Sequence, residues 1–194
     1  RIGEFWYMLL AEGGTERGHA VTIARGVSPS GPFEPAPDNP ILTARGTASP
    51  VQSTGHADLV QRADGSWAMV YLGVRPRGSS PEFHVLGRET FASDIYWTDG
   101  WPGLGGPIAP KAADPTGERL DGPTLPLSWV SPGRFPAEVL RYDEGAWLLC
   151  ATTGDAAAEG LSFVGRRQEQ LYATVTATVR VTGAVGGLSV RIDG

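Results

Sequence analysis

Cysteine is almost absent from this sequence of 194 residues, because Cys150 is the only one. A single cysteine excludes an internal disulfide and gives no cluster of thiolates for a metal ion. Cys150 ends the apolar run Trp147–Cys150. Free cysteine behaves as a small hydrophobic residue in such a setting, so the run predicts that Cys150 is buried.

Long apolar runs and an excess of basic residues are also missing. No run reaches the length of a membrane span, so a membrane is not predicted as a partner. The net charge is −5, which does not suit nucleic acid but is compatible with neutral sugars. No signal peptide is visible, which slightly favours a cytoplasmic over a secreted location. The chain starts at Arg1 without Met, and this leaves an upstream signal open.

Glycine and proline, in contrast, are abundant. The 27 glycines and 16 prolines make up about a fifth of the chain. Such a content is typical of many short strands joined by tight turns. With 41% hydrophobic residues the chain has enough apolar side chains for a packed core. No convincing amphipathic helix is visible, so the sequence predicts an all-β fold.

A weak internal repeat organises the first half. Gly3–Leu9 resembles Gly65–Tyr71, and each is a turn glycine followed by an aromatic-rich strand. The Asp64–Gly65 pair predicts a hairpin turn between two strands. The copies lie about sixty residues apart, a spacing that suits propeller blades of four strands each.

Composition predicts a boundary between residues 100 and 125, which divides residues 1–110 from a second all-β module in 111–194. Gly100–Pro107 is read as a turn-rich stretch at this boundary. The β-branched alternation of Leu171–Val181 predicts a long strand of an antiparallel sheet. Leu188–Ile192 is predicted as a further strand, and His19–Arg25 as one in the first half.

Three short motifs carry most of the functional information: Thr54–Asp58, Gly87–Phe91 and Ala11–Thr15. The first two place a charged or metal-capable side chain in a short strand beside small residues. Together the motifs resemble the later propeller blades of glycoside hydrolase family 43, the group of β-xylosidases and α-L-arabinofuranosidases. Phe163–Gln168 resembles a segment of the concanavalin-like β-sandwich that follows the propeller in the β-xylosidase branch.

This resemblance implies the last blades of a five-bladed β-propeller followed by part of a β-sandwich. It implies inverting hydrolysis of xylo- or arabino-oligosaccharides, in which one carboxylate acts as general acid and another as general base. The family's two aspartates lie in earlier blades. Its acidic glutamate lies just before the strand that corresponds to Phe5–Leu10. No residue of this chain matches these positions, so the resemblance assigns it no catalytic residue.

His56 is the first candidate for the site. In the family the matching histidine lies on the propeller axis near a calcium ion or a water, and Gly55 and Ala57 would let the strand approach that axis. Calcium prefers oxygen ligands, so a contact through water is expected. The alternative is a buried histidine that bonds a backbone carbonyl.

Arg88 is the second candidate, because its family counterpart bonds sugar hydroxyls in the innermost subsite. A guanidinium offers five donors in a fixed fork. The alternative is a structural ion pair, although adjacent Glu89 should point to the opposite face of the strand. Gln52 and Thr54 are predicted to line the cavity beside His56 and bind substrate.

The remaining polar candidates have weaker arguments. Glu12 is expected to brace its glycine-rich loop or to border the pocket, with catalysis as the less favoured alternative. Asp58 is expected to share the face of His56 but to bond a backbone amide. His19 and His84 show no spacing of metal ligands and are read as ordinary polar contacts. Trp101 is read as a core residue, with stacking on a sugar as the alternative.

A different class of function stays open, a non-catalytic carbohydrate-binding or scaffold fragment. The strand at Ile2–Leu10 and the strand at Leu188–Ile192 both lack a sequence partner, so the chain is expected not to be a self-sufficient fold. A companion polypeptide that supplies the missing blades is one predicted partner. An active site would then form across the two chains.

Overall fold

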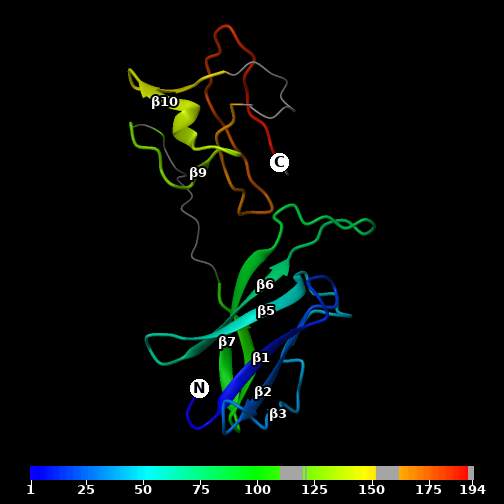
Figure 1. The fold of residues 1–194 in the computed structure, drawn as a ribbon. Helices are drawn as coiled ribbons and strands as arrows, with labels where there is room; N and C mark the ends of the chain where they lie inside the picture. Colours follow the sequence, from blue (N-terminus) through cyan, green and yellow to red (C-terminus); the bar gives the residue numbers. More distant parts are fainter. Residues whose placement is uncertain (110–119, 121, 152–161, 192–194) are drawn as a thin grey trace. The chain divides into compact units, whose positions relative to one another are not determined.

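The computed structural model describes residues 1–109, 120, 122–151 and 162–191, and strands dominate this part of the chain (Figure 1). The chain divides into two compact units, residues 1–112 and residues 113–194. The all-β prediction is confirmed, and the short 3₁₀ turn η1 (Pro136–Glu138) is the one helical element among the described residues. None of the helical segments in these ranges is long and apolar enough to cross a membrane.

The first sheet of the first unit is built around β2. Its strands are β1 (Trp6–Glu12), β2 (Ala20–Gly26), β3 (Glu34–Pro35) and β4 (Leu42–Thr43). β1 pairs antiparallel with one edge of β2, in a register that runs from Trp6 opposite Gly26 to Glu12 opposite Ala20. Both short strands, β3 and β4, pair with β2.

The second sheet is a four-stranded antiparallel meander in the order β5-β6-β7-β8. Its strands are β5 (Gln52–Gln61), β6 (Trp67–Val74), β7 (Glu89–Thr98) and β8 (Trp101–Pro107). The Asp64–Gly65 turn joins β5 to β6, as the sequence predicts. Each copy of the weak repeat therefore lies in a four-stranded sheet of its own.

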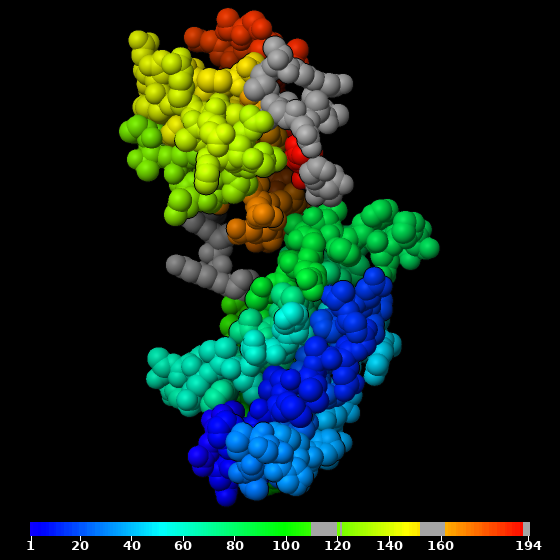
Figure 2. Space-filling view, viewed as in Figure 1, coloured from blue at the N-terminus to red at the C-terminus, as the bar shows by residue number. Residues whose placement is uncertain are grey.

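The core of the first unit holds residues from both sheets. Val21 and Leu42 come from the first sheet, and Met69 and Ile95 come from the second. Val21 and Met69 are almost fully buried. In the space-filling view the surface of the residues before 20, in blue, borders the cyan surface of β5 (Figure 2). The two sheets are therefore packed against each other, and burial of apolar area stabilises this packing.

The prediction for Gly100–Pro107 was wrong, because most of this stretch is the strand β8. Asp99 and Gly100 form a two-residue connection with φ of 51° and 75°, which places Thr98 opposite Trp101. Positive φ at both central residues is the signature of the tight turn that joins antiparallel strands. Gly103 is not a loop residue either, because a Cβ there would lie 2.3 Å from the ring of Tyr96.

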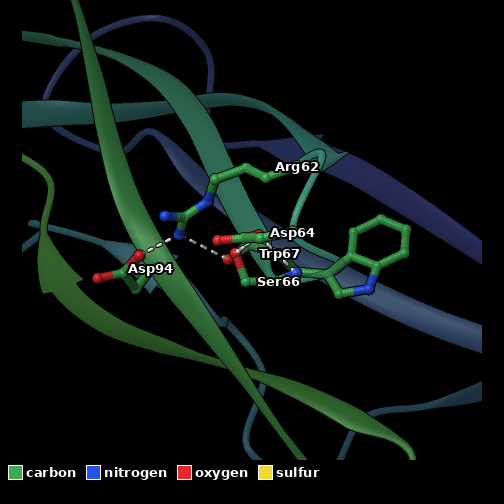
Figure 3. A network of polar contacts seen from close by, with 5 residues as sticks. All are labelled: Arg62, Asp64, Ser66, Trp67 and Asp94. Atoms are coloured by element: carbon green, nitrogen blue, oxygen red, sulfur yellow. Dashed lines mark hydrogen bonds and ion pairs between the residues drawn. The ribbon is translucent and has the colours of Figure 1, made fainter.

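A network of polar contacts surrounds the β5–β6 turn, at the same end of this sheet as the Asp99–Gly100 turn (Figure 3). The Asp64 carboxylate accepts hydrogen bonds from the Ser66 backbone N–H at 3.0 Å and from the Ser66 hydroxyl at 2.6 Å. Arg62 donates to the carbonyl of Trp67 at 3.2 Å and pairs with Asp94 of β7. The hydrogen bond from the Ser66 hydroxyl is the main cause that lowers the pKa of Asp64 below its ordinary value.

Asp64→Asn tests this turn. Asparagine keeps an acceptor oxygen but cannot ionise. Because folding lowers the pKa of Asp64, its ionisation stabilises the folded chain above the ordinary pKa, and this contribution is lost as the pH falls through the lowered pKa. We expect the stability advantage of the wild type over the variant to be present at about pH 7 and to disappear at low pH. Urea unfolding of both proteins at a series of pH values measures this difference in the free energy of unfolding. A difference that does not change with pH would contradict the prediction.

The second unit contains β9 (Trp129–Val130), η1, β10 (Leu140–Asp143), β11 (Ala146–Leu149) and β12 (Gly165–Arg166). β10 and β11 form a hairpin, and β12 pairs with β9. The predicted strand at Leu171–Val181 was wrong, because this stretch has no strand. Residues 188–191 have none either, and Ile192 lies outside the described residues. β-branched alternation makes a strand only where a partner and a covering layer exist.

Cys150 is exposed, so the prediction of a buried cysteine was also wrong. Its backbone N–H donates to the carbonyl of Val139 at 2.8 Å, just beyond the end of β11. Leu148 and Leu149 are also more than a third exposed. The apolar run therefore belongs to a two-stranded hairpin with an exposed face, and apolar character alone did not predict its burial.

Candidate functional site

The start of β5, which carries the Thr54–Asp58 motif, is irregular. Ser53 and His56 have φ of 54° and 53°, and the pairing with β6 shifts register on either side of Gly55. Left-handed φ at a residue other than glycine costs on the order of 1–3 kcal/mol and persists where the surroundings fix it. Residues 52–55 are all buried, whereas His56 is exposed. The strand therefore does not alternate here, and a bulge turns the His56 side chain outward.

The buried histidine is His19, and it contacts the same strand. Only 4% of His19 is exposed, and its Nδ1 lies 3.2 Å from the carbonyl oxygen of Ser53. A Cβ at Gly55 would lie 2.4 Å from the Cδ2 and Nε2 atoms of the His19 ring. Gly55 thus makes room for this ring. The alternative interpretation of His56, a buried histidine bonded to a backbone carbonyl, describes His19 instead.

A hollow of about 230 Å³ lies where β1 meets β5. One wall comes from Leu9, Leu10 and Ala11 of β1, and the other comes from His56, Ala57 and Asp58 of β5. Val21 of β2 also contributes to it. The hollow therefore combines apolar surface with one imidazole and one carboxylate. A sugar ring has apolar faces and hydroxyl edges, and such a mixed lining suits both.

Gln52 and Thr54 do not belong to the lining of this hollow. Gln52 is 3% exposed, and its amide donates to the carbonyls of Thr47 at 3.0 Å and Ser49 at 2.8 Å. It therefore holds the loop before β5 in place. Thr54 is 5% exposed, and its hydroxyl has no hydrogen-bond partner among the residues that the structure describes. Direct sugar contacts by either side chain stay a prediction.

We expect Thr54→Val to leave the free energy of unfolding unchanged or to raise it by about 1 kcal/mol. Valine keeps the branched shape, whereas the buried hydroxyl gives no hydrogen bond that offsets its desolvation. Chemical unfolding of both proteins measures this difference. A loss of more than about 1 kcal/mol would show that the hydroxyl has a partner after all.

Arg88 lies at the end of the loop between β6 and β7 and is exposed. Its Nη1 donates to the hydroxyl of Thr15 at 2.8 Å, in the loop that follows β1. An ion pair between Arg17 and Glu82 joins the same two loops. Two contacts thus hold these loops together, and Arg88 reaches across from one sheet to the other.

Glu89 points away from Arg88 and pairs with Arg75, as the strand alternation predicts. Its two oxygens accept from Arg75 at 2.9 Å and 2.6 Å, and this hydrogen bonding raises the pKa of the guanidinium. The structural ion pair considered for Arg88 is therefore made by Arg75. Glu12, at the end of β1, accepts from the Thr22 hydroxyl at 2.8 Å, which agrees with a bracing role.

The other candidates are dispersed. His84 lies exposed in the loop between β6 and β7. Trp101 packs edge-on against Tyr7 and lies under the guanidinium of Arg25, 4.1 Å from the ring centre. This packing supports the interpretation of Trp101 as a core residue. The interpretation of His19 as an ordinary polar contact missed its place against β5. The one sequence signal for this contact was the glycine at position 55, which leaves room for the His19 ring.

The described side chains do not build the predicted calcium site by themselves. No group of three or more His, Cys, Asp or Glu residues that could hold a metal ion occurs in the described ranges. His56 and Asp58 line one hollow, but calcium takes six to eight oxygen ligands. Calcium near His56 therefore stays a prediction that needs ligands from elsewhere.

Comparison with known proteins gives one consistent result. The family model described as glycosyl hydrolases family 43 matches residues 1–102. The non-reducing end α-L-arabinofuranosidase BoGH43B of Bacteroides ovatus is 36% identical over 222 residues, which cover 100% of this chain and 40% of the relative. A β-xylosidase of Bacillus subtilis is 43% identical over 113 residues, which cover 52% of this chain and 20% of the relative.

Solved structures agree with the sequence matches. The crystal structure of the GH43 BlXynB protein from Bacillus licheniformis superposes with a TM-score of 0.72 at 32% identity. The match covers 88% of this chain and 36% of that protein. The chain thus spans well under half the length of the relatives that it matches.

Proposed function

This chain belongs to family 43 of the glycosyl hydrolases, and on that premise we propose that the whole protein hydrolyses β-xylosides or α-L-arabinofuranosides. The observation that carries the proposal is the match of the family model to residues 1–102, the part that holds the first four-stranded sheet and the second one up to the start of β8. This chain is similar to one relative named for each of these activities. The proposed substrates are oligosaccharides derived from hemicellulose. The proposed architecture is a five-bladed propeller followed by a β-sandwich.

The proposed chemistry is inverting hydrolysis, with the acid and the base supplied from outside residues 1–194. Inversion needs two carboxyl groups roughly 6.5–9.5 Å apart, so that a water molecule fits between base and sugar. Among the described residues, Asp58 is the one carboxylate that lines the hollow between β1 and β5. Glu12 and Glu89 already accept hydrogen bonds from Thr22 and Arg75. Because these carboxylates already have hydrogen-bond partners, they support a role for this chain in binding rather than in proton transfer.

In this proposal His56 and Arg88 hold the sugar. The exposed imidazole of His56 can donate a hydrogen bond to a sugar hydroxyl or accept one from it, whereas the guanidinium of Arg88 can only donate. The Thr15 hydroxyl is the partner of Arg88 in the structure. A sugar hydroxyl that takes the place of this contact would leave the positive charge next to the reacting carboxylates. There it would stabilise the ionised form of a general base.

The test is hydrolysis of nitrophenyl β-xyloside and nitrophenyl α-L-arabinofuranoside by the whole protein. Release of nitrophenol from at least one of them is the expected result, and NMR of the first product should show the inverted anomer. Inactivity on both substrates, in a protein that unfolds cooperatively, would refute the proposed substrates. A product with retained configuration would refute the proposed chemistry alone.

The second candidate is a non-catalytic carbohydrate-binding or scaffold role for residues 1–194. The observation that favours it is that Asp58 is the one carboxylate in the lining of the hollow among the residues that the structure describes. Calorimetry with xylobiose and the isolated chain distinguishes the candidates. Binding without turnover supports the second candidate for this chain. Turnover by residues 1–194 alone would show that the acid and the base lie within them.

A further inference from the structure

His19 is a buried, titratable side chain that the proposed function does not use. Its backbone is fixed on both sides, because its N–H donates to the Glu16 carbonyl at 2.9 Å and its carbonyl accepts from the Thr43 hydroxyl at 2.9 Å. The residue directly precedes β2. The main chain around His19 is therefore anchored, and the direction of its ring is determined by the first sheet.

The ring of His19 reaches the second sheet at the bulge of β5. Nδ1 lies 3.2 Å from the carbonyl oxygen of Ser53, and a carbonyl can only accept. Nδ1 therefore carries the proton and donates. The far edge of the ring fills the space that glycine leaves at position 55. One histidine thus makes a directed hydrogen bond and a tight packing contact within three residues of the same strand.

Those contacts fall on the segment that determines where His56 points. Ser53 accepts the hydrogen bond and has φ of 54°, Gly55 packs under the ring, and His56 has φ of 53°. Bulges re-aim a side chain, and left-handed residues persist only where neighbours fix them. His19 supplies such neighbours for this bulge. His56 then lies exposed on the wall of the hollow between β1 and β5.

We propose that His19 is a positioning residue for His56. Its Nδ1–H and its ring hold the β5 bulge, and the bulge turns the His56 imidazole into the hollow where the sugar is proposed to bind. The inference rests on the proposed function only in taking that hollow as the place where the sugar binds. The link between the two histidines is a property of the fold and has a readout of its own.

The hydrogen bond distinguishes positioning from simple filling of the core. His19→Phe keeps an aromatic ring but removes the donor, whereas His19→Asn keeps an N–H donor on a smaller side chain. If the ring only fills space, phenylalanine should be the better replacement. If the donor holds the bulge, asparagine should be the better one. His84→Phe is the matched control, because His84 is exposed.

The experiment follows the NMR signal of the His56 ring in the whole protein. This signal is assigned by its disappearance in the His56→Gln variant. We expect this signal to move in His19→Phe, to return to its wild-type position in His19→Asn, and to stay unchanged in His84→Phe. In the whole protein, kcat/KM on the better nitrophenyl glycoside should fall about ten- to a hundredfold in His19→Phe and much less in His19→Asn. A misplaced contact residue has effects of this order.

The outcomes separate this inference from the proposed function. A whole protein that cleaves neither glycoside refutes the function, while the NMR comparison still decides the role of His19. An unmoved His56 signal in a cooperatively folded His19→Phe overturns the inference, whatever the activity. If His19→Phe does not fold, His19→Asn decides: a wild-type His56 signal supports positioning, and a displaced one overturns it. If neither variant folds, His19 maintains the fold as a whole, and the inference fails.

Discussion

Arg88→Ala is expected to lower kcat/KM of the whole protein about ten- to a hundredfold. The proposed function gives Arg88 a direct contact with the sugar, and hydrogen bonds to charged groups are worth roughly 1.5–3 kcal/mol. The side chain is exposed and makes its described hydrogen bond with Thr15. Its removal should therefore leave the free energy of unfolding nearly unchanged. Steady-state kinetics on both nitrophenyl glycosides, together with a thermal unfolding curve, measures the two effects separately.

Two further variants show which property of Arg88 matters. Thr15→Ala removes the partner of the guanidinium but leaves the charge, so its effect on kcat/KM should be much smaller than that of Arg88→Ala. Arg88→Lys keeps the charge but loses the planar fork of donors, and an intermediate value is expected. An unchanged kcat/KM in a folded Arg88→Ala protein would place Arg88 outside the substrate site. Equal losses in Thr15→Ala and Arg88→Ala would instead assign the effect to the contact between the two loops.

The strands of the first unit could largely be predicted from local patterns. Aromatic and β-branched runs predicted β1, β2 and β6, and the Asp64–Gly65 pair predicted the hairpin between β5 and β6. Asp99–Gly100 is the same type of signal, but the glycines that follow it favoured a loop. Two of them serve close packing instead, since a Cβ at Gly103 would meet the ring of Tyr96 and a Cβ at Gly105 would meet the backbone of Asp94. Local sequence does not distinguish a glycine that turns the chain from one that makes room for a neighbour.

The second unit was harder to predict because its strands depend on partners. Leu171–Val181 has the alternation of a strand, yet Val175 and Val179 are more than half exposed. β-propensity expresses how well a side chain fits a pleated, half-buried surface, and it has no effect where that surface is missing. The alternation therefore indicated that this segment can form a strand, but it did not indicate whether a partner strand is present among the described residues.

The site could be predicted as a set of residues but not as an arrangement. The motif at Thr54–Asp58 marked the correct strand, and the glycine at position 55 predicted a close approach. What approaches it is His19, a residue 36 positions earlier, and no local pattern links the two. The bulge also breaks the period-2 alternation by which exposure along β5 is judged. Gln52 and Thr54 were therefore expected at the cavity but lie in the interior.

One arginine fixes the packing of the two sheets at the end away from the candidate site. Arg25 of β2 donates through Nη1 to the carbonyl of Asp99 at 2.7 Å, in the turn between β7 and β8. Its guanidinium carbon lies 4.5 Å from the ring centre of Phe5 and 4.1 Å from that of Trp101. Nε donates to Glu34 at 2.7 Å. A hydrogen bond, two cation–π contacts and an ion pair therefore meet on one side chain.

Arg25→Ala is expected to lower the free energy of unfolding of the first unit by about 2–4 kcal/mol. The side chain of Arg25 is only 15% exposed, because its guanidinium lies against the rings of Phe5 and Trp101. The side chain of Glu34 is 61% exposed, and exposed ion pairs contribute about 0–1 kcal/mol. Most of the loss should therefore come from the contacts with Asp99 and the two rings, of which those with Asp99 and Trp101 join the two sheets. Urea unfolding followed by tryptophan fluorescence measures it.

Glu34→Gln is the matched control, because it breaks the ion pair but leaves the rings and the Asp99 carbonyl in place. We expect it to change the free energy of unfolding by less than about 1 kcal/mol. Arg25→Lys should fall between the two variants, since an ammonium group keeps the charge but cannot stack as a plane between two rings. If Glu34→Gln costs as much as Arg25→Ala, the ion pair and not the contact between the sheets determines the stability. If neither variant changes the unfolding curve, Arg25 does not hold the two sheets together, and the buried cluster of Val21, Leu42, Met69 and Ile95 suffices to pack them.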